Sequence, residues 1–169
     1  VDDTLCLNPE AVEKAITTFE LNGKKKNIGI LSRNILNSVL VDFACLSFGR
    51  RIVPIPLNST SEHISYILDH SEIDILFVDS KNGERRLNDI KEKSTIKVIN
   101  LENQNLSYGE IDSLPWDIFL QKGDFINQFD LNKLMSDVEL ESVNTVMYTS
   151  GTTDNPKGIH PDIKIIPLP

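Results

Sequence analysis

Residues that could bind phosphate gather in one short stretch of this sequence, directly after an apolar segment. Hydroxyl side chains combine there with one glycine and one lysine: Thr149, Ser150, Gly151, Thr152, Thr153 and Lys157. Glycine has no Cβ, so backbone N–H groups can approach an anion closely, and the hydroxyl and ammonium groups add donors and positive charge. A solvated turn rich in Ser and Thr has the same composition. The residue types alone therefore leave phosphate binding and an ordinary turn both open.

The two most familiar phosphate loops do not fit this stretch. A Walker A loop has a glycine directly before its lysine and a hydroxyl residue after it, whereas Lys157 lies between Pro156 and Gly158. The G-x-G-x-x-G turn of dinucleotide sites is absent as well. The sequence thus argues against a P-loop NTPase and against a classical NAD site.

An alternation of strands and helices precedes the stretch and predicts how it is positioned. Apolar, β-branched runs predict strands, and amphipathic or buried helical patterns fall between them: strands at 27–31, 51–57, 73–79 and 95–100, helices at 34–48, 59–72 and 81–93. This order indicates an α/β fold, a doubly wound, mostly parallel sheet with flanking helices. Such sheets bind ligands beyond the carboxyl ends of their strands, and a strand predicted at 143–149 leads into the stretch.

The segment 101–141 is less regular. It contains two helical pieces, at 115–123 and 130–140, with little clean periodicity between them. Trp116 is expected to make a core contact rather than to stack on a base. Ahead of the first strand, Asn8 and Pro9 predict the start of another helix, with a capping side chain followed by proline at its first position.

Charge and composition exclude some classes of function. The net charge is −8 and the pI is near 4.8, which opposes nucleic-acid binding because phosphate neutralisation needs a basic surface. Cys6 and Cys45 lie far apart, outside any metal-spacing motif, which is typical of a reducing compartment. No signal-peptide pattern is present, and the most apolar run, at 38–48, is about half the length that spans a bilayer. We expect a soluble, cytoplasmic protein without a transmembrane segment.

The histidines and isolated acids give no second site. His63 and His70 lie two helical turns apart and cannot hold one metal together, so we interpret them as surface or hydrogen-bonded polar residues and predict no metal site. His160 matches no role. The acids Asp74, Asp79 and Asp89 form no recognisable pair, and a solvated surface is the default interpretation for them.

The ordered string from Tyr148 to Gly158, YTSGTTDNPKG, closely resembles the signature loop of the adenylate-forming (AMP-binding) enzymes, a superfamily that includes the acyl-CoA synthetases. Residues 27–80 resemble an earlier block of the same family, in which a buried helix ends in glycine and a Val-Pro-Leu strand follows. The resemblance therefore covers 27–80 and 143–158, and it implies that residues 1–169 form part of the large N-terminal domain of such an enzyme.

The resemblance implies a two-step reaction. A carboxylate attacks the α-phosphate of MgATP, and coenzyme A then takes the acyl group from the adenylate. Among the branches of the family, residues 55–68 look most like the fatty acyl-CoA synthetases, which implies a fatty acid as the carboxylate. The residues that match the family's triphosphate loop are Thr149, Ser150, Gly151, Thr152, Thr153 and Lys157. The expected partners are thus a small carboxylic acid and a nucleotide, together with ATP, Mg²⁺ and coenzyme A, and peripheral membrane contact stays open. The catalytic residues and the oligomeric state stay unknown.

Two differences from the family motivate an alternative. Asp154 stands where the family usually has glycine, and a carboxylate repels a triphosphate. After Gly158 three prolines oppose the helix that the family continues with, and the family's later parts, its small C-terminal domain included, have no counterpart here. We therefore expect an enzyme fragment that is inactive on its own. The alternatives are a non-catalytic nucleotide-binding or regulatory module and, less specifically, an α/β interaction domain in which the loop is an ordinary turn.

Overall fold

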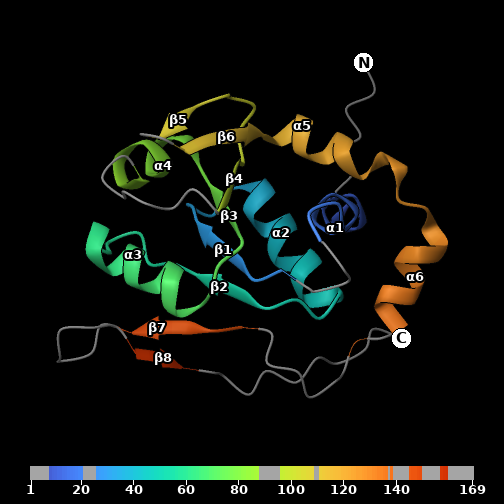
Figure 1. The fold of residues 1–169 in the computed structure, drawn as a ribbon, viewed down its shortest axis with the longest axis horizontal. Helices are drawn as coiled ribbons and strands as arrows, with labels where there is room; N and C mark the ends of the chain where they lie inside the picture. The colour runs from blue at the N-terminus through green and yellow to red at the C-terminus, as the bar shows by residue number, and fades with distance from the viewer. Residues whose placement is uncertain are drawn as a thin grey trace.

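The structure is a computed structural model that describes residues 8–20, 26–87, 96–108, 111–136, 138, 145–149 and 157–159. A six-stranded sheet with the order β2-β1-β3-β4-β6-β5 forms its centre (Figure 1). Neighbouring strands are parallel except for β5, which pairs antiparallel with β6. The strands are β1 (Ile28–Leu31), β2 (Ile52–Pro54), β3 (Ile75–Val78), β4 (Lys97–Asn100), β5 (Ser107–Tyr108) and β6 (Ile111–Pro115). The predicted α/β fold with a mostly parallel sheet is confirmed.

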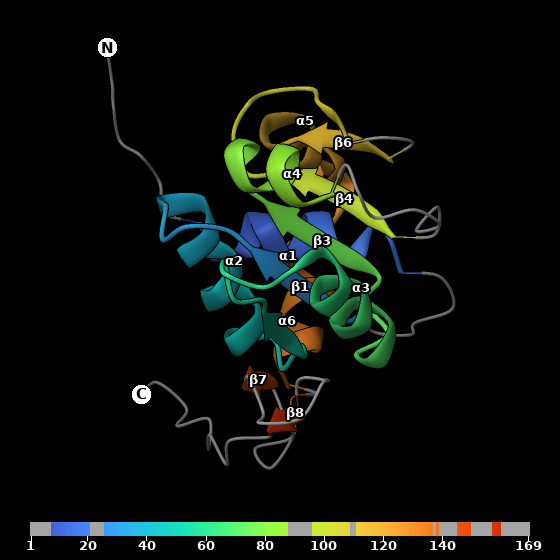
Figure 2. The same ribbon diagram turned by 90° about the vertical axis from the view of Figure 1, so that its left-hand side faces the viewer.

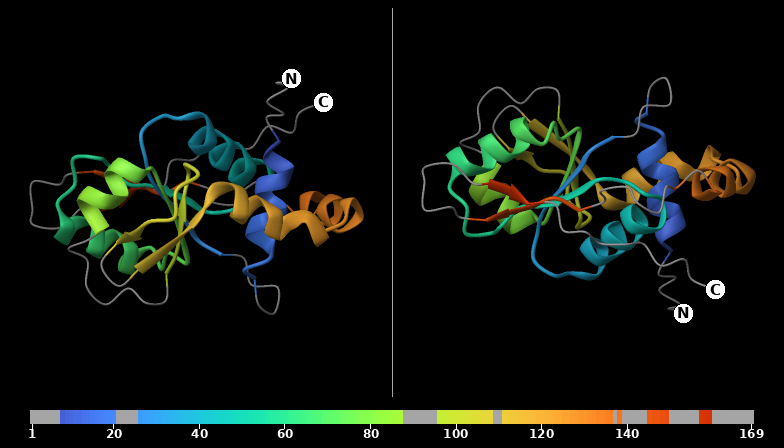
Figure 3. Two further views of the ribbon diagram at one scale, coloured as in Figure 1. Left: turned by 90° about the horizontal axis from the view of Figure 1, so that it is seen from above. Right: turned by 90° about the horizontal axis from the view of Figure 1, so that it is seen from below.

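Helices cover both faces of this sheet, as Figure 3 shows from above and below. One face carries α1, α2 and α5, and the other carries α3 and α4. The helical elements are α1 (Pro9–Thr17), α2 (Leu36–Ser47), α3 (Ser61–His70), α4 (Ser80–Leu87), α5 (Trp116–Gln121), the 3₁₀ helix η1 (Lys122–Phe125) and α6 (Gln128–Ser136). None of the described helices has both the length and the apolar character needed to cross a bilayer.

The core consists of two groups of buried side chains, one on each face of the sheet. Strand β3 contributes to both because successive side chains of a strand point to opposite faces. Ile75 and Phe77 pack with α1, α2 and α5, whereas Leu76 and Val78 pack with α3 and α4. This explains why the 73–79 segment is an almost continuous apolar run.

The chain runs outward from β1 in both directions, which makes β1 and β3 the point where the strand order reverses. Strand β2 lies on one side of β1 and β3 on the other. In open α/β sheets the crevice at this reversal, beyond the carboxyl ends of the strands, is where ligands bind. Strand β2 lies at the margin of this sheet, a place that suits its proline because proline cannot donate a ladder hydrogen bond.

The helical pieces predicted within 101–141 are confirmed as α5 and α6, but two strands in this segment escaped prediction. Strand β6 extends the parallel sheet beside β4, and β5 returns antiparallel along it. Polar Asp112 and Ser113 interrupt any apolar run in β6, so the strand gives no clear periodic signal. Trp116 packs against Phe77 and Phe119 in the core, as expected.

Candidate functional site

A separate two-stranded hairpin holds both ends of the predicted phosphate loop. Strand β7 (Met147–Thr149) pairs antiparallel with β8 (Lys157–Ile159), and Thr149 lies opposite Lys157 in the register. The first and last of the predicted site residues are therefore neighbours. Ser150, Gly151, Thr152 and Thr153, and Asp154 with them, lie outside the described residues. The strand predicted before the loop is confirmed at 147–149, while β8 was not predicted.

The hairpin is attached to the margin of the main sheet, beside β2, and lies below that sheet in Figures 1 and 2. Thr145 forms a parallel bridge with Ile52, and the Val146 N–H donates a 3.0 Å hydrogen bond to the Ile52 carbonyl. Because this bridge is parallel, β7 runs in the same direction as β2. Thr149, the last residue of β7, thus lies toward the side where the parallel strands have their carboxyl ends, which is where such sheets bind ligands.

The side chains of β7 alternate between solvent and core. Met147 is 47% exposed, whereas Val146 and Tyr148 are buried and pack with the group of side chains under α3 and α4. The Tyr148 hydroxyl lies 2.6 Å from His70 Nδ1 and 2.6 Å from Ser71 Oγ. His70 is thus a hydrogen-bonded polar residue, as expected, and its partner is part of the predicted phosphate motif.

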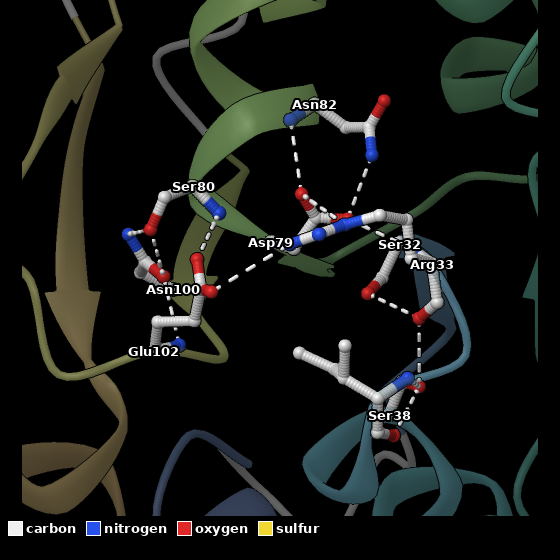
Figure 4. A network of polar contacts seen from close by, with 9 residues as sticks. Ser32, Arg33, Ser38, Asp79, Ser80, Asn82, Asn100 and Glu102 are labelled. Carbon is white, nitrogen blue, oxygen red and sulfur yellow. Dashed lines mark hydrogen bonds and ion pairs between the residues drawn. The ribbon is translucent and has the colours of Figure 1, made fainter.

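A second polar cluster lies at the carboxyl ends of β1, β3 and β4 (Figure 4). Asp79, directly after β3, is fully buried and accepts hydrogen bonds from the Arg33 N–H at 2.8 Å, the Asn82 N–H at 3.1 Å and Asn82 Nδ2 at 2.7 Å. Burial opposes the ionisation of Asp79, but the hydrogen bonds from Asn82 and Arg33 outweigh it, so its pKa lies below the usual range. Asp79 also caps the start of α4.

Glu102 extends this cluster to the segment after β4. Its carboxylate accepts a 2.9 Å hydrogen bond from the Ser80 N–H and lies 3.6 Å from Arg33 Nη2. Asn100 and Ser80 exchange side-chain hydrogen bonds beside it. The cluster joins the segments that follow three adjacent strands. Because Asp79 and Glu102 share Arg33 and accept hydrogen bonds from backbone N–H groups, the geometry suits a structural support at the strand-reversal point better than a catalytic acid or base.

The solvated interpretation of the isolated acids is wrong for Asp79, which sits in this buried cluster. Asp74 also has partners, since Lys26 Nζ lies 2.9 Å from its Oδ1 and the Asn27 N–H donates to its Oδ2. Asp89 and His160 lie outside the described residues. A sequence signal for Asp79 did exist: an acid directly after an apolar strand, with Asn three residues later, is a helix-capping pattern. In the part of the chain that the structure describes, His, Cys, Asp and Glu form no group of three that could hold a metal ion.

Comparison with known proteins gives a consistent picture. The sequence pattern described as "AMP-binding enzyme" matches residues 15–161. Fatty acyl-CoA synthetase A of Dictyostelium discoideum is 32% identical over an alignment of 165 residues that covers 91% of this chain and 23% of that protein. Long chain acyl-CoA synthetase 2 of Arabidopsis thaliana is 28% identical over 142 residues, covering 78% of this chain and 20% of that protein. The chain thus spans about a quarter or less of the length of these relatives.

The fold is shared with a solved acyl-CoA synthetase. The fatty acyl CoA synthetase of Mycobacterium tuberculosis superposes with a TM-score of 0.56 at 18% sequence identity, over 92% of this chain and 28% of that structure. At this identity the likeness concerns the fold alone. The predicted fold is therefore found in an enzyme whose name agrees with those of the sequence relatives.

Proposed function

This chain belongs to the AMP-binding enzyme family, and on that premise we propose that its loop at 149–157 holds the phosphates of ATP while a carboxylic acid is activated. The register that places Thr149 opposite Lys157, at the carboxyl side of the sheet, is the observation that carries the proposal. This register places the first residue of the loop beside its last, the lysine. An anion can then be bound by backbone N–H groups of the loop and by the Lys157 ammonium group together.

The reaction we propose has two transfers. A carboxylate oxygen of the acid bonds to the α-phosphorus of ATP, the bond between the α-phosphorus and the bridging oxygen breaks, and pyrophosphate leaves. A thiolate, that of coenzyme A, then bonds to the acyl carbon and AMP leaves. The relatives are named for fatty acids, so we propose a fatty acid as the substrate.

The role of this chain in that reaction is to hold charge. Hydroxyl, amide and ammonium donors of the loop suit the oxygens of the β- and γ-phosphates, and donors fixed in advance stabilise charge as it develops on the leaving pyrophosphate. Amide N–H and ammonium groups cannot ligate a cation, and Mg²⁺ is usually bound through substrate phosphates and one or two carboxylates, so we propose that Mg²⁺ is held mainly by the phosphates. We propose that the catalytic residues for both transfers lie in other parts of a longer polypeptide like its relatives, of one of which this chain spans 23%.

Titration of the purified chain with MgATP, followed by NMR, tests the phosphate role. We expect Lys157→Ala to weaken MgATP binding by at least about tenfold, since a charge-assisted hydrogen bond is lost. The matched control is Lys97→Ala, an exposed lysine at the amino end of β4, and its affinity is expected to equal that of wild type. Equal affinities for Lys157→Ala and wild type would remove the phosphate role.

A second experiment tests the enzyme. An antibody against residues 27–80 identifies the protein in its native cells by mass, and a species well above 19.0 kDa is then assayed for ATP–pyrophosphate exchange with fatty acids. Exchange that depends on the acid supports the proposed ligase. A product near 19.0 kDa without exchange supports the alternative, a nucleotide-binding module, which Asp154 in the loop also favours.

A further inference from the structure

We propose that Tyr148 anchors the phosphate loop through its hydroxyl, and that His70 and Ser71 are positioning residues for that loop. The inference rests on the proposed function, because it assigns the residues that hold the same site in place. Tyr148 lies within the loop's own motif, two residues before Ser150, yet its side chain is only 6% exposed and reaches into the core. Its side chain therefore connects the start of this motif to the body of the domain.

The Tyr148 hydroxyl is held from two directions. His70 Nδ1 and Ser71 Oγ each lie 2.6 Å from the oxygen, so the hydroxyl has two partners at short hydrogen-bonding distance. The Tyr148 ring also meets the His70 ring edge-to-face, with the centroids 5.9 Å apart, and the Tyr66 ring stacks on His70 at 5.3 Å. Three rings in succession thus fix the direction of the tyrosine side chain.

The partners belong to a rigid element. His70 is the last residue of α3 and Ser71 is its C-cap. The first turn of α3 is fixed by Thr60, whose side chain accepts a 3.2 Å hydrogen bond from the His63 N–H, and its apolar face is buried through Ile64, Ile67 and Leu68. The anchor point therefore has the stability of a capped, packed helix.

Backbone contacts alone hold the hairpin only at its beginning. Among the described residues, the hydrogen bonds and bridges that join β7 to the main sheet end at Val146, two residues before Tyr148. Closer to the loop, the Tyr148 side chain binds the hairpin to the end of α3 through His70 and Ser71. Binding sites require their donors to be held within about 0.5 Å of the productive position, so release of this anchor should reduce phosphate affinity.

The test compares variants of the whole chain by amide hydrogen exchange and by MgATP titration. Tyr148→Phe, Ser71→Ala and His70→Leu each remove part of the anchor. In Tyr148→Phe we expect amide exchange in the β7–β8 hairpin to accelerate by roughly five- to tenfold, while amides of β1 and β3 stay unchanged. MgATP affinity is expected to fall by roughly the same factor.

Two further variants separate positioning from general packing. In His70→Asn the amide group of asparagine can replace Nδ1, so this variant should retain most of the affinity that His70→Leu loses. His63→Leu, on the same helix but remote from Tyr148, is the matched control and should behave as wild type. If His70→Asn and His70→Leu lose equal MgATP affinity, the hydrogen bond between His70 and Tyr148 is not what anchors the loop.

The outcomes distinguish this inference from the proposed function. Unchanged hairpin exchange in Tyr148→Phe overturns the anchor, whatever Lys157→Ala shows. A loosened hairpin with unchanged MgATP affinity overturns the positioning role and assigns Tyr148 to stability alone. Lack of saturable MgATP binding in wild type, or unchanged affinity in Lys157→Ala, overturns the proposed function and with it the positioning role.

Discussion

Arg50 and Glu13 form a bidentate ion pair that is closed to solvent. Arg50 Nε lies 2.6 Å from Glu13 Oε2, and Arg50 Nη2 lies 2.6 Å from Glu13 Oε1. The exposed fractions of the two side chains are 0% and 1%, and Glu20 binds the same guanidinium group through Nη1. Since Glu13 lies on α1 and Arg50 follows the turn after α2, the pair fixes α1 against the start of β2.

Removal of Arg50 should therefore destabilise the fold strongly. Arg50→Ala leaves the Glu13 carboxylate buried without its counter-ion, which costs about 3–5 kcal/mol of the free energy of unfolding. Urea denaturation followed by circular dichroism measures this change. The control is Arg51→Ala at the neighbouring exposed position, for which a change within about 0.5 kcal/mol is expected.

The double variant Glu13→Leu/Arg50→Met refines this prediction. Replacing Glu13 and Arg50 by apolar side chains removes the Glu13 carboxylate and leaves only that of Glu20 without its partner. Arg50→Ala leaves both carboxylates without it, so the double variant should be the more stable of the two. If Arg50→Ala costs no more than Arg51→Ala, the buried pair does not contribute as the structure indicates.

Asp79 should make stability depend on acid pH. Its pKa is lowered in the folded state by the hydrogen bonds from Asn82 and Arg33, against the effect of burial. Its contribution is therefore fully present above the unfolded pKa near 4, and is lost as the pH falls through the lower folded value. Urea midpoints measured from pH 6 to pH 2 should fall less steeply in Asp79→Asn than in wild type. The same series on Asp124→Asn, an exposed acid, should parallel wild type, and parallel curves for Asp79→Asn would contradict the assignment.

Asp154 should weaken nucleotide binding through its charge. Two like charges ~6 Å apart repel by about 3 kcal/mol at an effective dielectric near 20, so removal of this carboxylate should tighten MgATP binding by at least tenfold. Asp154→Asn removes the charge, and Asp154→Gly also restores backbone freedom. Similar gains in MgATP affinity in both variants would identify charge repulsion as the cause. A gain in Asp154→Gly alone would identify the conformation of the loop as the cause. No gain in either would mean that the carboxylate faces solvent.

Cys45 should report global unfolding. Its side chain is fully buried in the core, and burial, partly offset by the nearby Arg50 charge, raises the pKa of its thiol far above the usual value. Only the thiolate reacts with alkylating reagents, so labelling of Cys45 at neutral pH requires the chain to unfold. In a Cys6→Ser background, the labelling rate with iodoacetamide should therefore rise with urea in step with circular dichroism. Rapid labelling without denaturant would show that the core opens locally around Cys45.

The sheet and its helices could be predicted because their signals are local. Apolar runs at 27–31 and 73–79 match β1 and β3, and the glycine after the buried helix ends α2 with a left-handed residue, Gly49, at φ 63°. The apolar, β-branched run at 51–57 likewise matches β2. These features depend on residues close together in the chain, and each has a direct conformational cause.

The contacts of Tyr148 and Arg50 could not be predicted in the same way. Tyr148 and His70 are 78 positions apart, and Arg50 and Glu13 are 37 positions apart, so no sequence period connects them. Strand β6 was also missed, since its polar residues suit a strand only because β4 is already beside it. For the loop, residue composition alone could not decide between phosphate binding and an ordinary turn, and the resemblance to a family motif favoured phosphate binding. The role of its central residues stays a prediction.

The sheet separates two groups of buried side chains, and this has a consequence for how the sequence can diverge. Val146 and Tyr148 pack with α3 and α4, while α1, α2 and α5 pack on the opposite face. Substitutions on the second face need not alter the surroundings of the hairpin, because the strands lie between them. Substitutions that repack α1, α2 and α5 should therefore leave the hairpin in place, whereas substitutions among the side chains under α3 and α4 should reach it directly.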